Sequence, residues 1–415
     1  MEFTKSIKEY YAAQSLIVGG VKKMNKLGPI EKFPIYFSRA KGSIVWDIDG
    51  NEYVDFISGK GAIILGYAND EVNSQVVNQI NMSNFMPLSN PIQNELARII
   101  NEKIPCAERV RLFRTGSCAA SALIRLARAY TKKEIILTSG YHGWHDTFTG
   151  VRNGVLTENS NYTLDFQYNV NLLEKLLVKY SGSVAAIFIT PELCFFGKEF
   201  YEECFHLSRK YNTLFLFDEI KTGFRTSLEG FQSKIGIIPD AATFSKAMGN
   251  GYAISAVAGF DKLMFAEEET HLSGTFDTEA SSIRASISTI ELLEKYNVAS
   301  YIENLGRYFA EELDKLFLKK KFPAKCFYKD ASAFHIIFET EDLGNEFYGE
   351  SINRGILFYC FNNVNLNYSH KKHQIDDVLN KLVNVIDVLT FDKGLLTESA
   401  YKNYLIKNRF VSEYE

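Results

Sequence analysis

Two ionisable residues stand directly after apolar segments that have the character of buried strands. Asp218 follows residues 213–217, and Lys246 follows residues 241–245, about one strand–helix–strand repeat further along the chain. Ligands bind at the carboxyl ends of the strands in open α/β sheets, so we expect both side chains at neighbouring strand ends. An unpaired buried ammonium is costly. Lys246 therefore either extends to solvent or is an amine that forms an imine with a carbonyl compound.

Two further segments have residue types that suit a ligand with a phosphate and a flat ring. Residues 115–117, Thr-Gly-Ser, precede a predicted helix at 119–130. Backbone N–H groups at a helix N-terminus bind anions, although a serine that only caps the helix gives the same pattern. Residues 141–144, Tyr-His-Gly-Trp, follow an apolar run at 134–138. An aromatic ring there either covers a planar ligand or closes the core.

The amine, the carboxylate, the phosphate site and the aromatic ring together match what pyridoxal 5'-phosphate requires. Its aldehyde needs a lysine, its ring nitrogen needs a carboxylate in order to stay protonated, and its phosphate needs N–H and hydroxyl donors. Each segment alone has a structural explanation. Because four separate segments meet the requirements of one cofactor, we predict that Lys246 carries pyridoxal 5'-phosphate and that Asp218 pairs with its ring nitrogen.

The segments that must position these residues alternate between helices and short apolar strands. Val72, Val76, Val77 and Ile80 are spaced for one face of a helix that begins near residue 70. Further helices are predicted at 119–130, 171–180, 200–211 and 279–296, and buried strands at 134–138, 185–190, 213–217 and 241–245. Such alternation is typical of an α/β protein with a mostly parallel sheet that helices cover on both faces.

The pattern changes near residue 300. The predicted elements there are helix 301–320, strand 333–338, helix 344–354, strand 356–361 and helix 374–390, which form a compact α+β unit. Near the N-terminus, a helix is predicted at 5–18 and a hairpin at 43–57, with its turn at Asp49-Gly50. We therefore expect residues 61–300 to form a large cofactor-binding domain. Residues 301–415 form a small domain, to which residues 1–60 contribute.

The composition excludes several other classes of protein. Apolar residues make up 46% and charged residues 23% of the 415, and the net charge of −4 gives no reason to expect nucleic acid as a partner. No stretch approaches the roughly 18 apolar residues that cross a membrane. The polar start is unlike a secretory signal, and six cysteines without a C-x-x-C pair favour a reducing cytoplasm.

Two pairs of histidines are spaced three residues apart, which suits metal ligands. They are His142 with His145, and His370 with His373. A structural or catalytic metal site needs three or four ligands. No further ligand clusters near either pair in the sequence, so we expect no metal.

Several longer stretches identify a family. They are Gly19-Gly20-Val21 and the segments at 42–72, 115–131, 141–146, 217–226, 244–259 and 273–276, among them TGSCAASALIRLARAYT, YHGWHD, FDEIKTGFRT and SGTF. In residues, order and spacing they resemble the class III aminotransferases of the fold-type I pyridoxal-phosphate enzymes, most closely the glutamate-1-semialdehyde aminomutase branch. The likeness covers about residues 12–380. It implies a large domain with a seven-stranded, mostly parallel sheet, and a smaller α+β domain.

The resemblance implies a role for each residue around the cofactor ring. Lys246 is similar to the lysine that forms the imine and moves the proton, and Asp218 to the acid that pairs with the ring nitrogen. Ile220 is expected to pack beneath the ring, and Tyr141 to stack on it.

The resemblance also implies how the phosphate is held and how the chain assembles. Gly116 and Ser117 are expected to hold the phosphate. Thr275 resembles a threonine that reaches the phosphate of the neighbouring subunit, which implies a homodimer with shared active sites. Glu279 resembles an acid that follows this threonine in aminomutase-like relatives.

The chain departs from the family's pattern in three places. Cys118 stands where family members usually carry an acid, and Thr190-Pro191 stands where they carry Glu-Pro, with Glu192 next in the chain. Residues 362–377 lack the Arg-Pro-Pro that binds a carboxylate in many diamine and ω-amino-acid transaminases. We expect Glu192 not to replace the family's glutamate, because it points elsewhere on an extended chain.

Three functions remain open at this point. The first is transfer of an amino group from a small donor to a small carbonyl or keto-sugar acceptor, in a surface-polysaccharide or related pathway. It is favoured because residues 147–165 lack the prolines of the aminomutase gating loop. The second is a 2,1-aminomutase of the glutamate-1-semialdehyde type. The third is a non-catalytic binding protein, which the presence of both Lys246 and Asp218 disfavours.

The sequence does not specify the substrate. Candidate substrate contacts are His142, Glu279, Arg225, Lys221 and Arg152. Such residues are more often solvated surface residues than substrate ligands.

Overall fold

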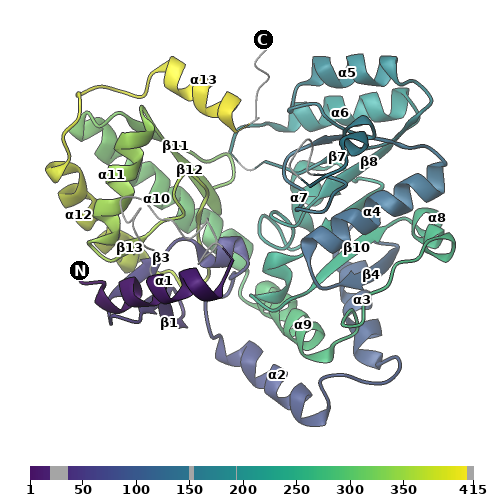
Figure 1. The fold of residues 1–415 in the computed structure, drawn as a ribbon, viewed down its shortest axis with the longest axis horizontal. Coiled ribbons are helices and arrows are strands. Elements are labelled where there is room, and N and C mark those ends of the chain that lie inside the picture. Colours follow the sequence, from purple (N-terminus) through teal and green to yellow (C-terminus); the bar gives the residue numbers. More distant parts are fainter. Residues whose placement is uncertain (19–35, 149–153, 193, 409–415) are drawn as a thin grey trace. The chain divides into compact units, whose positions relative to one another are not determined.

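The computed structural model describes residues 1–18, 36–148, 154–192 and 194–408 (Figure 1). The predicted glycines at 19 and 20 and the candidate Arg152 lie outside these residues. Within them the chain forms two compact units. The first takes in residues up to Asn69, Cys194 and Phe195, and Tyr301–Tyr404. The second takes in Asp70–Glu192, Phe196–Ser300 and the chain from Leu405 onwards.

A seven-stranded sheet forms the centre of the second unit (Figure 1). Its strands, in spatial order, are β4 (Arg109–Phe113), β10 (Ser255–Gly259), β9 (Ala241–Phe244), β8 (Leu214–Asp218), β7 (Val184–Ile189), β5 (Ile135–Ser139) and β6 (Thr163–Asp165). Every neighbouring pair is parallel except the two pairs that β10 makes. The predicted mostly parallel α/β sheet is therefore confirmed, with one strand reversed.

The central strands are apolar on both faces, so the helices of this unit must cover the sheet. Every residue of β5, β7 and β8 is buried, as the sequences IILTS, VAAIFI and LFLFD require. The helices are α2 (Asp70–Met82), α3 (Pro91–Lys103), α4 (Gly116–Thr131), α5 (Val170–Lys179), α6 (Lys198–Lys210), α7 (Gly230–Ile235), α8 (Asp261–Met264) and α9 (Ala280–Lys295). Helix α4 packs on β7, β9 and β10, and α6 on β8.

Helix α2 corrects one prediction about a helical face. Val72 and Val76 are buried, as expected, but Val77 and Ile80 are about half exposed. All four residues fit one apolar stripe by spacing alone, yet α2 packs on α9 along only part of that stripe. The rest of the stripe is an apolar surface in this chain.

The first unit contains two small sheets. One has the order β1 (Phe37–Lys41), β2 (Ile44–Asp47), β3 (Glu52–Asp55) and β13 (Ile356–Leu357), and the other the order β11 (Ala324–Phe327), β12 (Ala333–Phe338) and β14 (Val364–Asn365). Its helices are α1 (Thr4–Leu16), most of α10 (Val298–Lys320), α11 (Glu341–Ile352) and α12 (Lys372–Val388), and α13 (Glu398–Lys407) follows.

The predicted N-terminal hairpin is confirmed as β2 and β3. The Asp47 carboxylate closes its turn, because it accepts hydrogen bonds from the Asn51 backbone at 2.7 Å and from the Tyr53 hydroxyl at 2.8 Å. The predicted strand at 356–361 is wrong in length, since only Ile356–Leu357 pairs, in parallel with β3. Strand β3 ends at Asp55, so the later residues have no partner strand to continue along.

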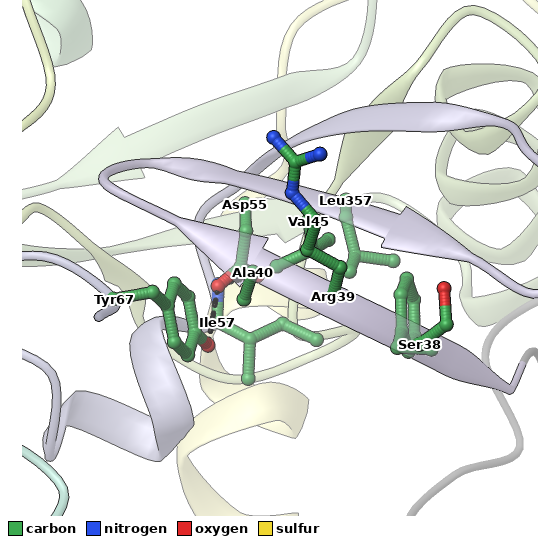
Figure 2. Close-up of a pocket in the computed structure, with 9 residues that line it drawn as sticks. Ser38, Arg39, Ala40, Val45, Asp55, Ile57, Tyr67 and Leu357 are labelled. Carbon is green, nitrogen blue, oxygen red and sulfur yellow. Dashed lines mark hydrogen bonds between the residues drawn. The ribbon is translucent and has the colours of Figure 1, made fainter.

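An open pocket of about 360 Å³ lies in the first unit (Figure 2). Residues of β1, β2, β3 and β13 line it, together with Ile57 and Tyr67. The Tyr67 hydroxyl donates to the buried Asp55 carboxylate at 2.8 Å. Burial raises the pKa of Asp55 to about 6, although hydrogen bonds from Tyr67 and two backbone amides oppose the shift. None of the residues predicted to hold the cofactor lines this pocket.

The helices and the cysteines bear on two further expectations, about a membrane span and about disulfide bonds. Among the helices of the described residues, none is long and apolar enough to cross a membrane. All six cysteines are free thiols.

Candidate active site

The register of the central sheet brings Asp218 and Lys246 to the same edge. Asp218 is the last residue of β8 and lies opposite Thr243 of the parallel neighbour β9. Strand β9 ends at Phe244, and Lys246 opens a short 3-10 turn directly beyond it. The predicted placement at neighbouring strand ends is confirmed. The Lys246 backbone is left-handed, with a φ of 44°, which costs about 1–3 kcal/mol outside glycine and is typical of functional sites.

Three donors hold the Asp218 carboxylate, which is buried. Oδ2 accepts a hydrogen bond from Nδ1 of His142 at 2.8 Å. Oδ1 accepts from the Ile220 backbone amide at 3.1 Å and from the Thr243 hydroxyl at 3.2 Å. Hydrogen bonds to a carboxylate are strong and stabilise its negative charge. Asp218 is therefore a fixed anion at the carboxyl edge of the sheet, as a partner of a protonated ring nitrogen must be.

His142 supports Asp218, which corrects its prediction as a substrate contact. Its ring stacks on Phe188 with centroids 4.2 Å apart, and only 2% of the residue is exposed. Because an ionised carboxylate only accepts, Nδ1 of His142 is the protonated nitrogen in this bond. The Thr190 hydroxyl lies 3.3 Å from the same nitrogen. A residue this deeply buried presents no surface to an incoming substrate.

The phosphate site predicted at Gly116 and Ser117 is the first turn of α4. The Thr115 hydroxyl caps this helix by accepting from the Cys118 amide at 3.3 Å. The amides of the first turn have no partner within a helix, so those of Gly116 and Ser117 suit an anion. A Cβ on Gly116 would lie 2.7 Å from Cδ1 of Ile220. The residue expected beneath the ring therefore lies against the turn expected to hold the phosphate.

The loop after β5 reaches the same place. A Cβ added to Gly143 would overlap the Ser117 side chain, so this loop passes directly over the first turn of α4. Tyr141 is 76% exposed, and its backbone oxygen accepts from the Thr190 hydroxyl at 3.2 Å. Its ring is thus free to cover a ligand. His145 bonds to the Ser121 hydroxyl at 2.9 Å, so the two histidines of the predicted pair have different partners.

These residues fit pyridoxal 5'-phosphate. The buried Asp218 carboxylate, the half-buried Ile220 and Lys246, and the N-terminal amides of α4 all belong to one edge of the sheet in the second unit. Glycine at 116 leaves space that a side chain would fill. The cofactor has an anion, a flat ring with a basic nitrogen, and an aldehyde, and the site supplies a complement to each.

Glu279 and Thr275 lie in the segment that precedes α9. Thr275 is exposed in this chain. Glu279 caps α9, accepting from the amides of Ser281 and Ser282 at 2.9 and 3.2 Å, and pairs with the Arg114 guanidinium at 3.0 Å. Burial raises the pKa of Glu279, but hydrogen bonds from the two serines outweigh it and lower the pKa overall. The structure thus gives Glu279 a helix-capping role, and its role as a substrate contact stays a prediction.

Arg225 and Lys221 occupy the turn that follows Asp218. Arg225 is 1% exposed, so burial corrects its prediction as a substrate contact. Lys221 forms an ion pair with Glu192 in which Nζ and Oε2 are 3.1 Å apart. Glu192 follows β7, the parallel neighbour of β8. Contrary to expectation, Glu192 does point back to the edge of the sheet where the site lies.

Three of these contacts were not predicted from the sequence: Thr190 with His142, Glu192 with Lys221, and Arg114 with Glu279. Thr190 directly follows a buried strand and Glu192 lies two residues further on, and that position was a usable signal. For Arg114 the signal was weaker, because an arginine after an apolar strand has many possible partners.

Comparison with solved structures supports the fold. The FumI protein of Sphingopyxis sp. MTA144, solved with pyridoxal phosphate, superimposes with a TM-score of 0.87 at 23% identity, over 92% of this chain and 96% of that one. The fold is therefore that of the fold-type I pyridoxal-phosphate enzymes.

Sequence comparison then defines the family. The family model Aminotransferase class-III matches residues 29–386. The 3-aminobutyryl-CoA aminotransferase of Cloacimonas acidaminovorans (strain Evry) is 34% identical over 389 residues, 89% of this chain and 94% of its own length. The chain belongs to the class III aminotransferases, and it is a pyridoxal 5'-phosphate-dependent aminotransferase or aminomutase.

Relatives of both kinds are found at similar distance. The 2'-deamino-2'-hydroxyneamine transaminase of Streptomyces kanamyceticus is 33% identical over 70% of this chain and 75% of its own length. The glutamate-1-semialdehyde 2,1-aminomutase of Sulfurihydrogenibium azorense is 31% identical over 75% of this chain and 78% of its own length.

Proposed function

We propose that the chain transfers an amino group between two separate molecules, from a small amino donor to a small carbonyl or keto-sugar acceptor. The observation that carries this proposal is the shared sheet edge, where Asp218 ends β8 and Lys246 follows β9. An amine and a fixed anion at that edge, beside an anion-binding helix N-terminus, are the parts that amino transfer needs.

The residues divide the work of the reaction. Pyridoxal phosphate, when bound, supplies an aldehyde for the amine and a ring that withdraws electrons from the substrate carbon. Asp218 keeps a proton on the ring nitrogen, and His142 holds Asp218 in place. The Lys246 amine takes a proton from the substrate carbon that bears nitrogen and returns it elsewhere, as a general base and then a general acid. Tyr141 and Ile220 are proposed to cover the two faces of the ring.

Two observations favour transfer between molecules over an aminomutase. An aminomutase must retain its intermediate, normally beneath a closing loop. Here Phe148 packs on Phe188 and the His142 ring, with centroids 5.9 and 5.2 Å apart. Thr163–Asp165 is paired as β6 in the sheet. Phe148 and β6 are thus packed within the second unit, and residues 147–165 lack the prolines of the aminomutase gating loop, which supports a site that releases its first product.

The acceptor is proposed from the relatives. One is named a 3-aminobutyryl-CoA aminotransferase and another a 2'-deamino-2'-hydroxyneamine transaminase. Neither name describes a diamine or a simple ω-amino acid. A carbonyl compound with polar substituents, such as a keto-sugar of a surface-polysaccharide pathway, is the proposed acceptor. A reducing cytoplasm is the proposed compartment, supported by the free thiols.

The first experiment follows the cofactor's absorbance while donors and acceptors are supplied one at a time. We expect an amino donor alone to convert the cofactor to its amine form and release a keto product in equal amount. An acceptor added afterwards should reverse the change, giving ping-pong kinetics. Lys246→Ala should abolish both half-reactions, with Lys246→Arg as the matched control that keeps the charge. A product formed from one substrate without any keto product would contradict the proposal and favour the aminomutase.

We further propose a homodimer with shared active sites. Thr275 is exposed, and so are several apolar side chains of the second unit. They lie on α2, in the segment that follows α2, and at position 276 next to Thr275: Val77, Ile80, Met82, Phe85, Leu88 and Phe276. The Phe85 and Phe276 rings are 6.1 Å apart. Large exposed apolar patches are typical of protein interfaces. A second copy of the chain is the proposed occupant.

Hybrid dimers test the sharing of sites. Subunits with Lys246→Ala and subunits with Thr275→Asp, co-expressed with different tags, should each be inactive alone. The aspartate repels the phosphate of the neighbouring site. The hybrid should regain activity at one of its two sites. A wild-type subunit paired with the double variant should be inactive, whereas sites built within one chain would leave it half active.

A further inference from the structure

The ion pair between Lys221 and Glu192 joins the ends of two neighbouring strands of the central sheet. Lys221 follows β8 by three residues and Glu192 follows β7 by three residues, and the two strands are parallel partners. Their charged atoms, Nζ and Oε2, are 3.1 Å apart. The Glu192 side chain is 4% exposed and that of Lys221 is 23% exposed. The pair therefore presents its cationic end to the surface and its anionic end to the interior.

The exposed end of this pair belongs to the edge where the cofactor site lies. Lys221 is next in the chain to Ile220, whose amide donates to Asp218 and whose side chain lies against Gly116. Glu192 lies two residues beyond Thr190, which contacts the His142 ring. Both charges are thus carried by the same turns that position the cofactor residues.

The pair cannot simply open to release its lysine. Removing the cation from a buried carboxylate leaves an uncompensated charge, which is strongly unfavourable. An ammonium, however, has three N–H donors, and Glu192 is the partner of one. Lys221 can therefore stay in place and donate its other hydrogen bonds to a ligand. Glu192 acts as the holder that fixes where those donors lie.

We propose that Lys221 is a specificity-determining residue that donates hydrogen bonds to the carboxylate of the amino donor. This inference rests on the proposed amino transfer at Lys246. Among the other cations beyond these strands, Arg225 is buried, Lys246 is proposed to hold the cofactor, and the two terminal nitrogens of Arg114 already donate two hydrogen bonds each. A ligand that approaches the pair meets the ammonium first, so a carboxylate is attracted and an additional ammonium is repelled.

The test uses the holoenzyme and donors that differ only in the carboxylate. L-Alanine is compared with isopropylamine, β-alanine with propylamine, and γ-aminobutyrate with butylamine, each in a single-turnover half-reaction. The readout is the ratio of kcat/KM within each pair. The key variant is Glu192→Gln with Lys221→Gln, which removes both charges and avoids an unpaired buried carboxylate. Lys221→Arg is the matched variant that keeps the cation.

For the amino acid that reacts best, we expect the double variant to lower the ratio roughly tenfold or more, mainly through KM. The bound cofactor's spectrum should be unchanged. Lys221→Arg should retain most of the wild-type ratio. An equal fall for both members of a pair would show a structural role and overturn the inference, as would an unchanged ratio or a wild-type preference for the amines. Absence of any half-reaction in the wild type would refute the proposed function itself.

Discussion

The hydrogen bond between His142 and Asp218 provides a quantitative prediction about the site. Nδ1 of His142 donates a hydrogen bond to Oδ2 of Asp218, whereas the Ile220 amide and the Thr243 hydroxyl both donate to Oδ1. Replacing His142 by phenylalanine keeps an aromatic ring against Phe188 but leaves Oδ2 without that donor. The negative charge of Asp218 is then less well stabilised, so the ring nitrogen of the cofactor keeps its proton less readily.

The size of the effect follows from the kind of bond. A hydrogen bond to a charged group contributes about 1.5–3 kcal/mol, and each 1.4 kcal/mol is tenfold in rate. We therefore expect His142→Phe to slow the first half-reaction roughly tenfold to a hundredfold at saturating cofactor. Single-turnover absorbance measures this rate directly, and a cofactor titration ensures saturation.

The matched control is His142→Asn, whose amide nitrogen takes the place of Nδ1. This variant keeps a donor for Asp218 but loses the stacking on Phe188. In the wild type the centroids of the His142 and Phe188 rings are 4.2 Å apart. We expect the rate of His142→Asn to stay near the wild type while its melting temperature falls. If His142→Phe reacted at the wild-type rate, or if both variants were equally slow, the hydrogen bond would not be the important contact and the reasoning would be refuted.

Two further predictions concern the turns around the cofactor. Gly116→Ala should weaken cofactor binding, because its Cβ would lie 2.7 Å from Cδ1 of Ile220. Adding Ile220→Val should restore part of the affinity, as measured by a cofactor titration. Equal affinities of the wild type and Gly116→Ala would contradict this. Burial raises the pKa of Glu219 from 4.5 to about 7, despite hydrogen bonds from Phe231 and Gln232. The folded chain then binds more protons in that range, so the free energy of unfolding should fall by roughly 3 kcal/mol as pH rises from 4.5 to 7. In Glu219→Gln, the free energy of unfolding measured by urea titration should differ less between pH 5 and pH 8 than in the wild type. An equal difference in the variant and the wild type would refute this prediction.

The central sheet was largely predictable because its strands are short apolar runs between amphipathic helices. Strands β5, β7, β8 and β9 lie within one residue of their predicted bounds. Strands β4, β6 and β10 were missed. The sequence of β10, SAVAG, is made of small residues with little preference for strands, and only its pairing between β4 and β9 makes it one.

The placement of the predicted cofactor residues at one edge of the sheet was predictable for a different reason. In an open α/β sheet, the residues after each strand collect at one edge whatever the details of packing. Asp218, Lys246 and the first turn of α4 therefore needed only the strand ends to be located. Which polar residues pair with one another at that edge was not predictable, because it depends on side-chain directions in three dimensions.

The sequence by itself determined the cofactor chemistry of this protein, since a lysine, an acid and a phosphate turn at strand ends have few other uses together. Only the tertiary structure decided what the surrounding polar residues do. It made His142 a support for Asp218, Glu279 a helix cap, and Glu192 the holder of Lys221. The physical reason is burial. A charged or polar group removed from water must find a partner, and the fold determines which partner is within reach.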